Sequence, residues 1–444
     1  MKILKFLCAL ITAGLLLCSC YDSNEPNDLA YATAVGIDKG ENNNFNITIQ
    51  FAKPHSISGG EGGGSGEDIL GSLTVEAPNI YAAIGLGNHI ISKSLDLSHL
   101  QLFLFSEEVA KEGIHNFIET ISRSKEIRPN VYTAVCKNKA SEYLKSATPV
   151  VDINPSKYYQ LIFGKSDFRS IPESYSQDLY FYMRLSGKNS VIPLAGVSEG
   201  GGEKGGGESQ QGQGGSGQGS SSEGSGGQGS QGGSSSEQNP LLEKAPVNTH
   251  NYEFSIRDYE AGQVEVFSDA KGEVTGSAVF KGDKMVGSMG IVDTQIYNYL
   301  TGDTSKNYVT FKTEKSTSPI TVLLGIDDKT RITYDKKNHT SNIKLSFAAD
   351  FVALPDDYVA EQDLEYFQSL AEKAIKEQAE ALIHRTQTEF NSDIVGFGMA
   401  AKNQFITNKE FDRFNWDMKY KDMKYSVDVE LEVRRTGLTL RKDI

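Results

Sequence analysis

Residues Leu100–Phe105 read LQLFLF, an almost continuous apolar run in the first half of this 444-residue chain. Such a run is typical of a central strand that is buried on both faces, because neither face carries a regular series of polar side chains. The segments on either side, 76–91 and 107–122, have the residue spacing of helices. Strands and helices therefore alternate here, and the sequence predicts a domain of mixed α and β structure.

The last third of the chain contains a long helical pattern and then a strand pattern. Apolar side chains recur every three or four residues over 363–390, which predicts a helix of roughly 40 Å. Over 423–434 apolar side chains alternate with charged or small ones, which predicts a strand with one face in water. Shorter strands are expected at 274–280, 285–289, 308–312, 320–325 and 343–352. The predicted fold class is α+β, with mixed sheets flanked by helices and a long helix before the final strand.

A compositional break divides the chain. Between Ser198 and Pro240, Gly, Ser, Gln and Glu replace nearly every apolar residue. Such a segment cannot bury enough apolar surface to offset the entropy lost on ordering, so we expect a disordered tether over 198–240. The predicted organisation is a leader over 1–19, an N-terminal α+β domain over 20–197, the tether, a middle β-rich domain over 241–325 and a C-terminal α+β domain over 326–444.

The first twenty residues have the pattern of a bacterial lipoprotein signal. Lys2 and Lys5 precede an apolar segment that is too short to span a bilayer. Leu17 and Ser19 stand where a lipobox has them relative to Cys20, so we expect cleavage before Cys20 and acylation of its thiol. Two acyl chains hold firmly where one holds reversibly, since each buried CH₂ contributes about 0.8 kcal/mol. The sequence predicts a lipid anchor on the outer face of the cytoplasmic membrane, with an ordinary secreted protein as the alternative.

Composition argues against several function classes. The formal net charge of −14 disfavours nucleic acid, whose phosphates need a basic surface, and disfavours electrostatic adhesion to anionic lipid. The seven histidines are scattered without metal-ligand spacing. Acidic pairs such as Asp356-Asp357 are most simply explained as solvent-exposed surface residues. We therefore expect that the protein is not an enzyme and has no catalytic residues, metal or cofactor. Cys136 is the one thiol outside the leader and the lipid site, and we expect it to be buried and inert.

An aromatic cluster near the C-terminus has two interpretations. Trp416, the one tryptophan, lies close in sequence to Phe414 and Tyr420. The cluster could form a local core wedge beneath the last strand. Alternatively, part of it could be exposed as a partner surface, where tryptophan and tyrosine are frequent anchors. Gly396 follows the long helix, and a glycine there can adopt the left-handed conformation that terminates a helix.

Several motifs occur together in a characteristic order. The run after the lipid cysteine is YDSNEPNDLA at 21–30, followed by VGIDKG at 35–40. The middle of the chain has Arg128-Pro129 and then AVFKGDKMVG at 278–287. The C-terminal part supplies DIVGFG at 393–398, Trp416 and VRRTG at 433–437. In order and spacing these segments resemble the Ger(x)C family, the lipoprotein C subunits of spore nutrient-germinant receptors. Tyr21 departs from the family's usual Trp, and the tether is longer than the family pattern leads us to expect.

The resemblance implies a role in receptor assembly and signalling that triggers spore germination. The partners that it implies are a multi-spanning A subunit and a transporter-like B subunit in the inner spore membrane. It supplies no ligand-binding or catalytic residues. The alternative is a lipoprotein solute-binding protein that serves a membrane permease. That class needs two similar lobes around a cleft, whereas the halves of this chain are unlike.

Overall fold

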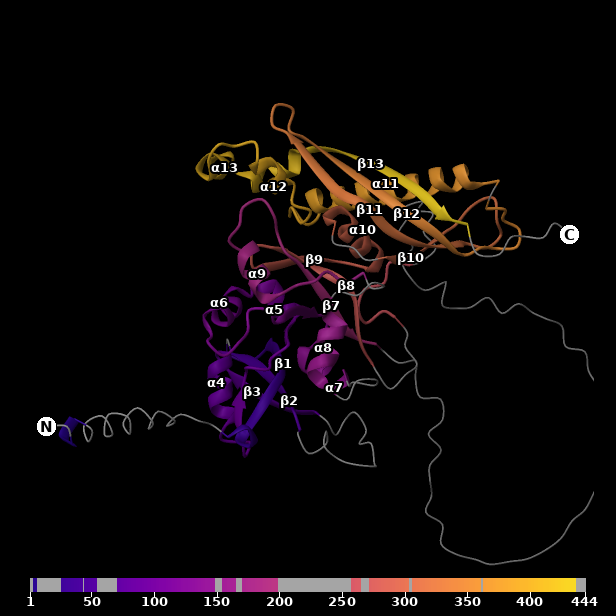
Figure 1. Cartoon of the computed structure of the whole chain (residues 1–444). Helices are drawn as coiled ribbons and strands as arrows, with labels where there is room; N and C mark the ends of the chain where they lie inside the picture. The colour runs from indigo at the N-terminus through magenta and orange to yellow at the C-terminus, as the bar shows by residue number, and fades with distance from the viewer. Residues whose placement is uncertain are drawn as a thin grey trace, which may run out of the picture. The chain divides into compact units, whose positions relative to one another are not determined.

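The computed structural model describes residues 3–5, 25–42, 44–53, 70–147, 154–164, 170–198, 257–264, 271–302, 306–360 and 362–436 (Figure 1). Cys20 with most of the leader, and the predicted tether after Ser198, lie outside the described residues. Among the described residues, no helix combines the length and the apolar composition that crossing a bilayer requires.

The first sheet contains nine strands, and LQLFLF supplies the middle of it. Its order is β3-β2-β1-β5-β6-β7-β8-β9, with the short β4 beside β1. Strands β1, β5, β6 and β7 run parallel, and the outer pairs on both sides are antiparallel. The bounds are β1 Leu29–Lys39, β2 Phe45–Ala52, β3 Leu70–Ala77, β4 Ser94–Asp96, β5 Leu102–Ser106, β6 Tyr132–Cys136, β7 Val191–Val197, β8 Gly272–Lys281 and β9 Lys284–Met289.

Helices cover both faces of the first sheet, which is why β5 is buried throughout. Phe103 and Phe105 point into a core that contains side chains of α4, α5, α6 and α9. Leu102 and Leu104 point into a second core that contains side chains of α7 and α8. The helix bounds are η1 Pro26–Asp28, α4 Ile80–Gly87, α5 Glu107–Glu112, α6 His115–Arg123, α7 Ala140–Ser146, α8 Pro155–Phe163 and α9 Ser176–Tyr182.

The second sheet has the order β10-β11-β12-β13, in which β12 and β13 run parallel. A parallel pair needs a long crossover, and helix α11 lies on it and packs on β13. The bounds are α10 Ile291–Thr301, β10 Asn307–Phe311, β11 Ile320–Asp335, β12 Thr340–Ala353, α11 Leu364–Thr388, α12 Phe397–Lys402, α13 Asn408–Phe414, α14 Trp416–Lys419, η3 Tyr420–Asp422 and β13 Lys424–Arg435. The predicted α+β class, with a long helix before the final strand, is confirmed.

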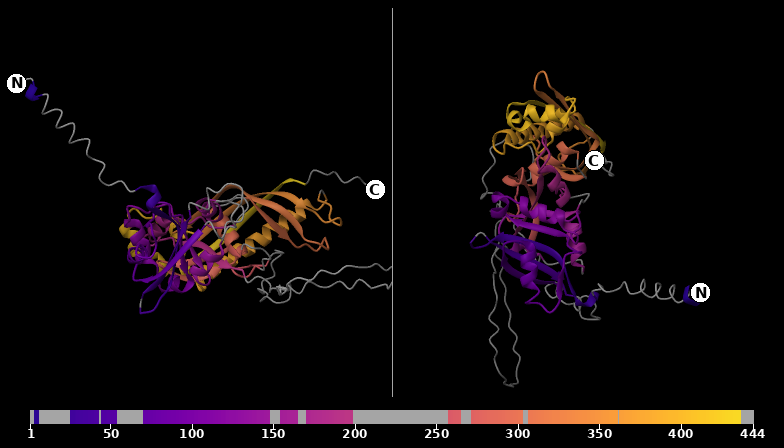
Figure 2. Two further views of the ribbon diagram at one scale, coloured as in Figure 1. Left: turned by 90° about the horizontal axis from the view of Figure 1, so that it is seen from below. Right: turned by 90° about the vertical axis from the view of Figure 1, so that its left-hand side faces the viewer.

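The middle domain predicted over 241–325 has no sheet of its own among the described residues. Its strands β8 and β9 join the first sheet, whereas β10 and the start of β11 belong to the second. The boundary predicted after residue 325 falls inside β11. Strands from both sides of the tether therefore share one sheet, and in Figures 1 and 2 the colours of that sheet run from indigo through magenta into pale orange. All described residues belong to one compact unit.

Candidate functional site

The loop between α11 and α12, residues 389–396, is built around the buried carboxylate of Asp393. One carboxylate oxygen, Oδ1, accepts hydrogen bonds from the backbone N–H groups of Gly396 at 2.8 Å and Phe397 at 3.1 Å. The other, Oδ2, accepts from Gly398 N at 2.7 Å and from Trp416 Nε1 at 2.9 Å. Two oxygens thus satisfy four donors. The side chain closes the loop on itself and fixes Trp416 against it.

Burial sets the protonation of this carboxylate. Loss of water raises the pKa of Asp393 to about 6, although the four N–H donors favour the charged form and lower it. The group is therefore ionised at neutral pH and titrates within the mildly acidic range. No Lys or Arg side chain forms an ion pair with it among the described residues. Hydrogen bonds from N–H groups therefore stabilise its negative charge.

The same loop is attached to the first sheet by one main-chain and one side-chain hydrogen bond. Asn189, just before β7, donates its backbone N–H to the carbonyl of Asp393 at 2.7 Å. Ser392 Oγ donates to the carbonyl of Phe280 in β8 at 2.6 Å. The Asn189 side-chain oxygen in turn accepts from Gly282 N at 3.0 Å. We call residues 187–190, 280–282 and 389–398 the Asp393 junction, because they connect the strands on either side of the tether to the C-terminal helices.

Two glycines allow this close approach. A Cβ atom added to Gly398 would lie 2.4 Å from the Cα of Gly187 and 2.6 Å from Trp416 Nε1. Gly396 has a φ of +93°, in the left-handed region that favours glycine. The predicted left-handed conformation is present, but Gly396 precedes α12 and does not end α11, which stops at Thr388.

A second buried polar cluster lies between α10, α11 and the segment 257–264. Asp293 in α10 is 2% exposed, accepts from Gln378 Nε2 at 2.7 Å and forms an ion pair with Arg385. Asp258 caps α10, because its Oδ1 accepts from Val292 N at 2.7 Å. Burial and the nearby charge of Asp293 raise the pKa of Asp258. The cluster fixes the segment that follows the tether onto two helices.

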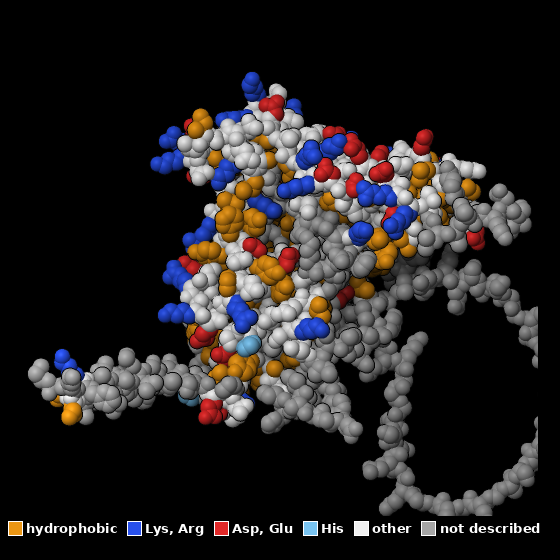
Figure 3. All heavy atoms as spheres, viewed as in Figure 1, with side chains coloured by type: hydrophobic (Ala, Val, Ile, Leu, Met, Phe, Trp, Pro, Cys, Tyr) orange, Lys and Arg blue, Asp and Glu red, His pale blue; other side chains and the backbone are white. Residues whose placement is uncertain are grey.

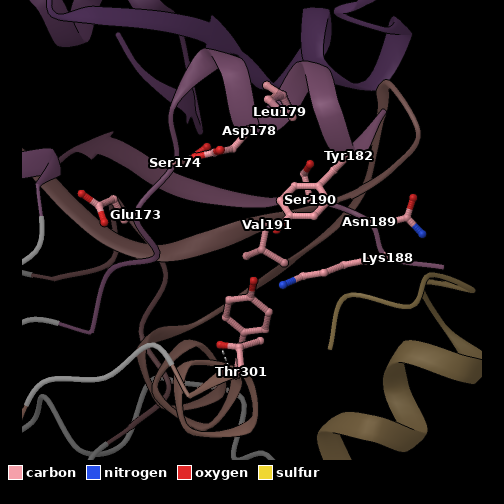
Figure 4. Close-up of a pocket in the computed structure, with 11 residues that line it drawn as sticks. Glu173, Ser174, Asp178, Leu179, Tyr182, Lys188, Asn189, Ser190, Val191 and Thr301 are labelled. Atoms are coloured by element: carbon pink, nitrogen blue, oxygen red, sulfur yellow. Dashed lines mark hydrogen bonds between the residues drawn. The ribbon is translucent and has the colours of Figure 1, made fainter. Parts of the chain in front are cut away.

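A pocket of 270 Å³ lies beside the junction (Figure 4). Glu173 and Lys188 are drawn at opposite ends of it, and the Lys188 ammonium lies 5.1 Å from the centre of the Tyr182 ring. Burial, followed by the charge of Glu173, raises the pKa of Asp178. Ser190 Oγ is buried there and has no hydrogen-bond partner among the described residues.

The described part of the chain offers neither a metal-binding cluster nor a reactive thiol. No group of three or more His, Cys, Asp or Glu side chains there is arranged to hold a metal ion. The thiol of Cys136 is fully buried, and burial raises its pKa to about 12, which keeps it protonated and unreactive. On the face seen in Figure 3, basic and acidic side chains are interspersed over the second sheet, and further basic side chains recur along the left-hand edge.

Two of the three aromatic residues suggested as a partner surface lie in the core. Trp416 is 0% and Tyr420 1% exposed, whereas Phe414 is only partly buried. The Trp416 ring packs edge-on against Tyr334 of β11, with centroids 5.5 Å apart. Trp416 and Tyr420 therefore fit the alternative of a core wedge, and a partner surface at Phe414 stays a prediction. Cys20, the predicted lipidation site, lies outside the described residues.

The sequence presents DIVGFG as part of the family resemblance and Gly396 as a helix end, but nothing in it singles out the first residue, Asp393, as the centre of the site. A buried carboxylate could have been suspected from an Asp that is followed directly by apolar residues and two glycines. Nothing in the sequence connects Asn189 with Asp393, which lies more than 200 residues further along the chain and on the other side of the tether.

The fold and the junction define the class of protein. It is an α+β protein of two sheets, in which buried carboxylates hydrogen-bond to the loops and helices between the sheets. Residues 22–197 match the family model described as Spore germination protein N-terminal domain, and residues 275–437 match Spore germination B3/GerAC like, C-terminal. The two matches together cover most of the chain. The chain belongs to the Ger(x)C family of spore germination proteins, as the sequence motifs predicted.

Individual relatives are similar over part of the chain. Spore germination protein KC of Bacillus subtilis (strain 168) is 28% identical over 189 residues, which are 41% of this chain and 46% of that protein. The putative spore germination protein YfkR of the same organism is 23% identical over 135 residues, 30% of this chain and 35% of that protein. The matched part thus spans less than half the length of these curated relatives. The crystal structure of the GerBC protein aligns with 93% of this chain and 99% of its own, at 13% identity and a TM-score of 0.48.

Proposed function

We propose that this chain is the lipid-anchored C subunit of a nutrient-germinant receptor and acts in the receptor assembly and signalling that trigger spore germination. The observation that carries the proposal is that both halves of the chain match family models of spore germination proteins. The lipobox before Cys20 supports membrane attachment. The solute-binding alternative is not favoured, because neither matched family model describes a binding protein of that class.

In this proposal the partners are the membrane-embedded A and B subunits of the receptor. The chain would be held on the outer face of the cytoplasmic membrane, which becomes the inner membrane of the spore. The Asp393 junction supports an assembly role, because it connects strands of the first sheet to the second half of the chain through buried contacts. A partner that binds either half would therefore meet one connected body.

The test is purification of a chain tagged at Ile444 from detergent-solubilised inner spore membranes. We expect multi-spanning receptor subunits to co-purify in near-equal amounts. Cys20→Ala should release the chain into the soluble fraction, whereas Cys136→Ala, the matched control at a buried cysteine, should stay in the membrane. Recovery of a permease, or membrane retention of Cys20→Ala, would contradict the proposal.

A further inference from the structure

Helix α4 and the turn after it carry apolar side chains on the outer surface. Tyr81 is 44%, Leu86 48% and Ile90 64% exposed, and we call these three residues the α4 face. From Ala77 to Ser92 the sequence contains no Asp, Glu, Lys or Arg, in a chain whose net charge is −14. This segment is therefore both apolar and free of the acidic groups that dominate the chain.

The exposure does not follow from the packing of α4 on its own domain. Ile80 and Ala83 on the opposite side are fully buried in the first core, so the helix already has its inner contacts. A surface helix of a soluble domain usually carries polar side chains on its outer face. Apolar side chains on both faces indicate that the outer face also has a partner.

The α4 face lies near the point where the described chain begins after the leader. Asn88, the C-cap residue directly after α4, accepts a hydrogen bond from Leu95 N at 2.9 Å through its side-chain oxygen. Leu95 in β4 pairs with Ala30 in β1. Neighbouring strands are about 4.8 Å apart, so the end of α4 is one strand away from the start of β1.

Covalent geometry then limits the distance to the predicted anchor. Glu25, the first described residue after the leader, is five positions after Cys20, and a fully extended chain of five steps spans at most about 18 Å. If Cys20 carries acyl chains in the bilayer, Glu25 cannot be further than this from the membrane surface. The end of the domain that carries β1, β4 and α4 is then within reach of the bilayer surface.

We propose that the α4 face docks on the surface of the lipid bilayer beside the anchor, an inference that rests on the proposed lipidation of Cys20. Tyrosine and aliphatic side chains suit the membrane interface, where a ring or chain is buried and a polar tip stays wet. The Tyr81 hydroxyl donates to Ser124 Oγ at 2.7 Å, and the adjacent Lys125 is exposed. Arg123, on the other side of Ser124, is ion-paired with Glu119 at 2.7 Å. Lys125 is therefore the cation that suits a lipid phosphate.

The experiment places a fluorescent probe on the α4 face of the acylated full-length chain. Acylation removes the thiol of Cys20, and Cys136 is buried and unreactive, so a cysteine introduced by Ile90→Cys is labelled selectively. The label is nitrobenzoxadiazole, whose emission depends on polarity. The matched control is Ile406→Cys, at another isoleucine, 93% exposed, between α12 and α13. Both proteins are reconstituted in phosphatidylcholine–phosphatidylglycerol vesicles that contain spin-labelled lipid.

We expect the probe at residue 90 to shift to shorter wavelength and to be quenched several-fold more by the spin-labelled lipid than the probe at residue 406. Leu86→Cys, labelled in the same way, should agree with residue 90. Equal, weak quenching at both positions on a chain that sediments with the vesicles would overturn docking and leave the anchor intact. A chain that does not sediment would overturn the anchor and docking together. Protection of residue 90 only after addition of receptor membrane subunits, without lipid quenching, would identify a protein partner and overturn the proposal.

Discussion

We expect that adding one methyl group at Gly398 strongly lowers the free energy of unfolding, because Gly398 is closely packed in the Asp393 junction. Gly398 lies in α12 without a positive φ, so its backbone accepts alanine, and Ala in a helix is favoured over Gly by about 1 kcal/mol. The new Cβ, however, would lie 2.4 Å from the Cα of Gly187. Because carbon atoms pack at about 3.5–4.0 Å, the two backbones must separate by about 1 Å.

The expected net effect of Gly398→Ala follows from these contributions. Overpacking in a filled core costs about 1–3 kcal/mol. Separation of the backbones also strains the hydrogen bond from Asn189 to Asp393 and the contact to Trp416, at about 1 kcal/mol each. After the helix preference is subtracted, we expect the free energy of unfolding to fall by about 2–4 kcal/mol. Urea unfolding followed by the fluorescence of Trp416 measures this, because the single tryptophan is buried and donates a hydrogen bond to Asp393 of the junction.

Gly85→Ala is the matched control for this measurement. Gly85 is an exposed glycine inside α4, and a Cβ there would meet no atom within 4 Å. The same substitution at this position should raise the free energy of unfolding by up to about 1 kcal/mol. A Gly398→Ala chain whose urea midpoint equals or exceeds that of the unmodified chain would refute the steric reasoning.

Four further predictions concern Trp416, Asp393, Cys136 and the tether. Trp416→Phe removes one of the four donors to Asp393 and leaves a cavity, so we expect a loss of about 2–4 kcal/mol in urea unfolding. The folded-state pKa of Asp393, about 6, is above the unfolded value of 3.8, so the folded chain binds this proton more readily. Stability should therefore rise as the pH falls from about 6 towards 4, by up to about 1.4 kcal/mol per pH unit, and Asp393→Asn should lack this part of the pH profile of urea midpoints. Cys136 should resist Ellman's reagent in the native chain and react fully in urea, whereas rapid native labelling would contradict its burial. Deletion of residues 203–250 should leave the fold intact and raise stability by about 1 kcal/mol through a shorter loop, as circular dichroism and urea unfolding can check.

The elements with a single strong periodicity were predictable from the sequence. The run at β5, the long helix α11 and the alternating final strand β13 all appear where the sequence places them. Helix α10 was missed for a physical reason. Residues Val292–Leu300 are buried without exception, including the polar Asp293 and Asn298. The helix therefore has no separate apolar and polar faces, and its sequence shows no helical periodicity. The helix predicted over 107–122 is divided at Gly113, whose φ is +127°.

The site was less predictable, because its partners are distant in sequence. The sequence showed that Asp393, Gly396 and Trp416 lie in one region of the chain, but an aromatic residue can equally belong to a core or to a surface. The indole N–H of Trp416 decides between the two, since it donates to a carboxylate that is itself buried. Such a pairing depends on the tertiary structure, and neither composition nor spacing encodes it.

The position of the tether explains how unlike halves can form one unit. Strand β7 ends directly before the tether and β8 begins after it, yet the two are antiparallel neighbours with Val197 opposite Gly272. The chain therefore leaves the sheet and returns to it at adjacent strands, and the length of the intervening segment has little effect on their pairing, because loop-closure entropy grows only slowly with length. Within the Asp393 junction, the loop 389–396 contacts the residues just before β7 and the carbonyl of Phe280 in β8. Coupling between the halves thus depends on buried contacts and not on the tether, so a long glycine- and serine-rich insertion can be carried at this point without separating them.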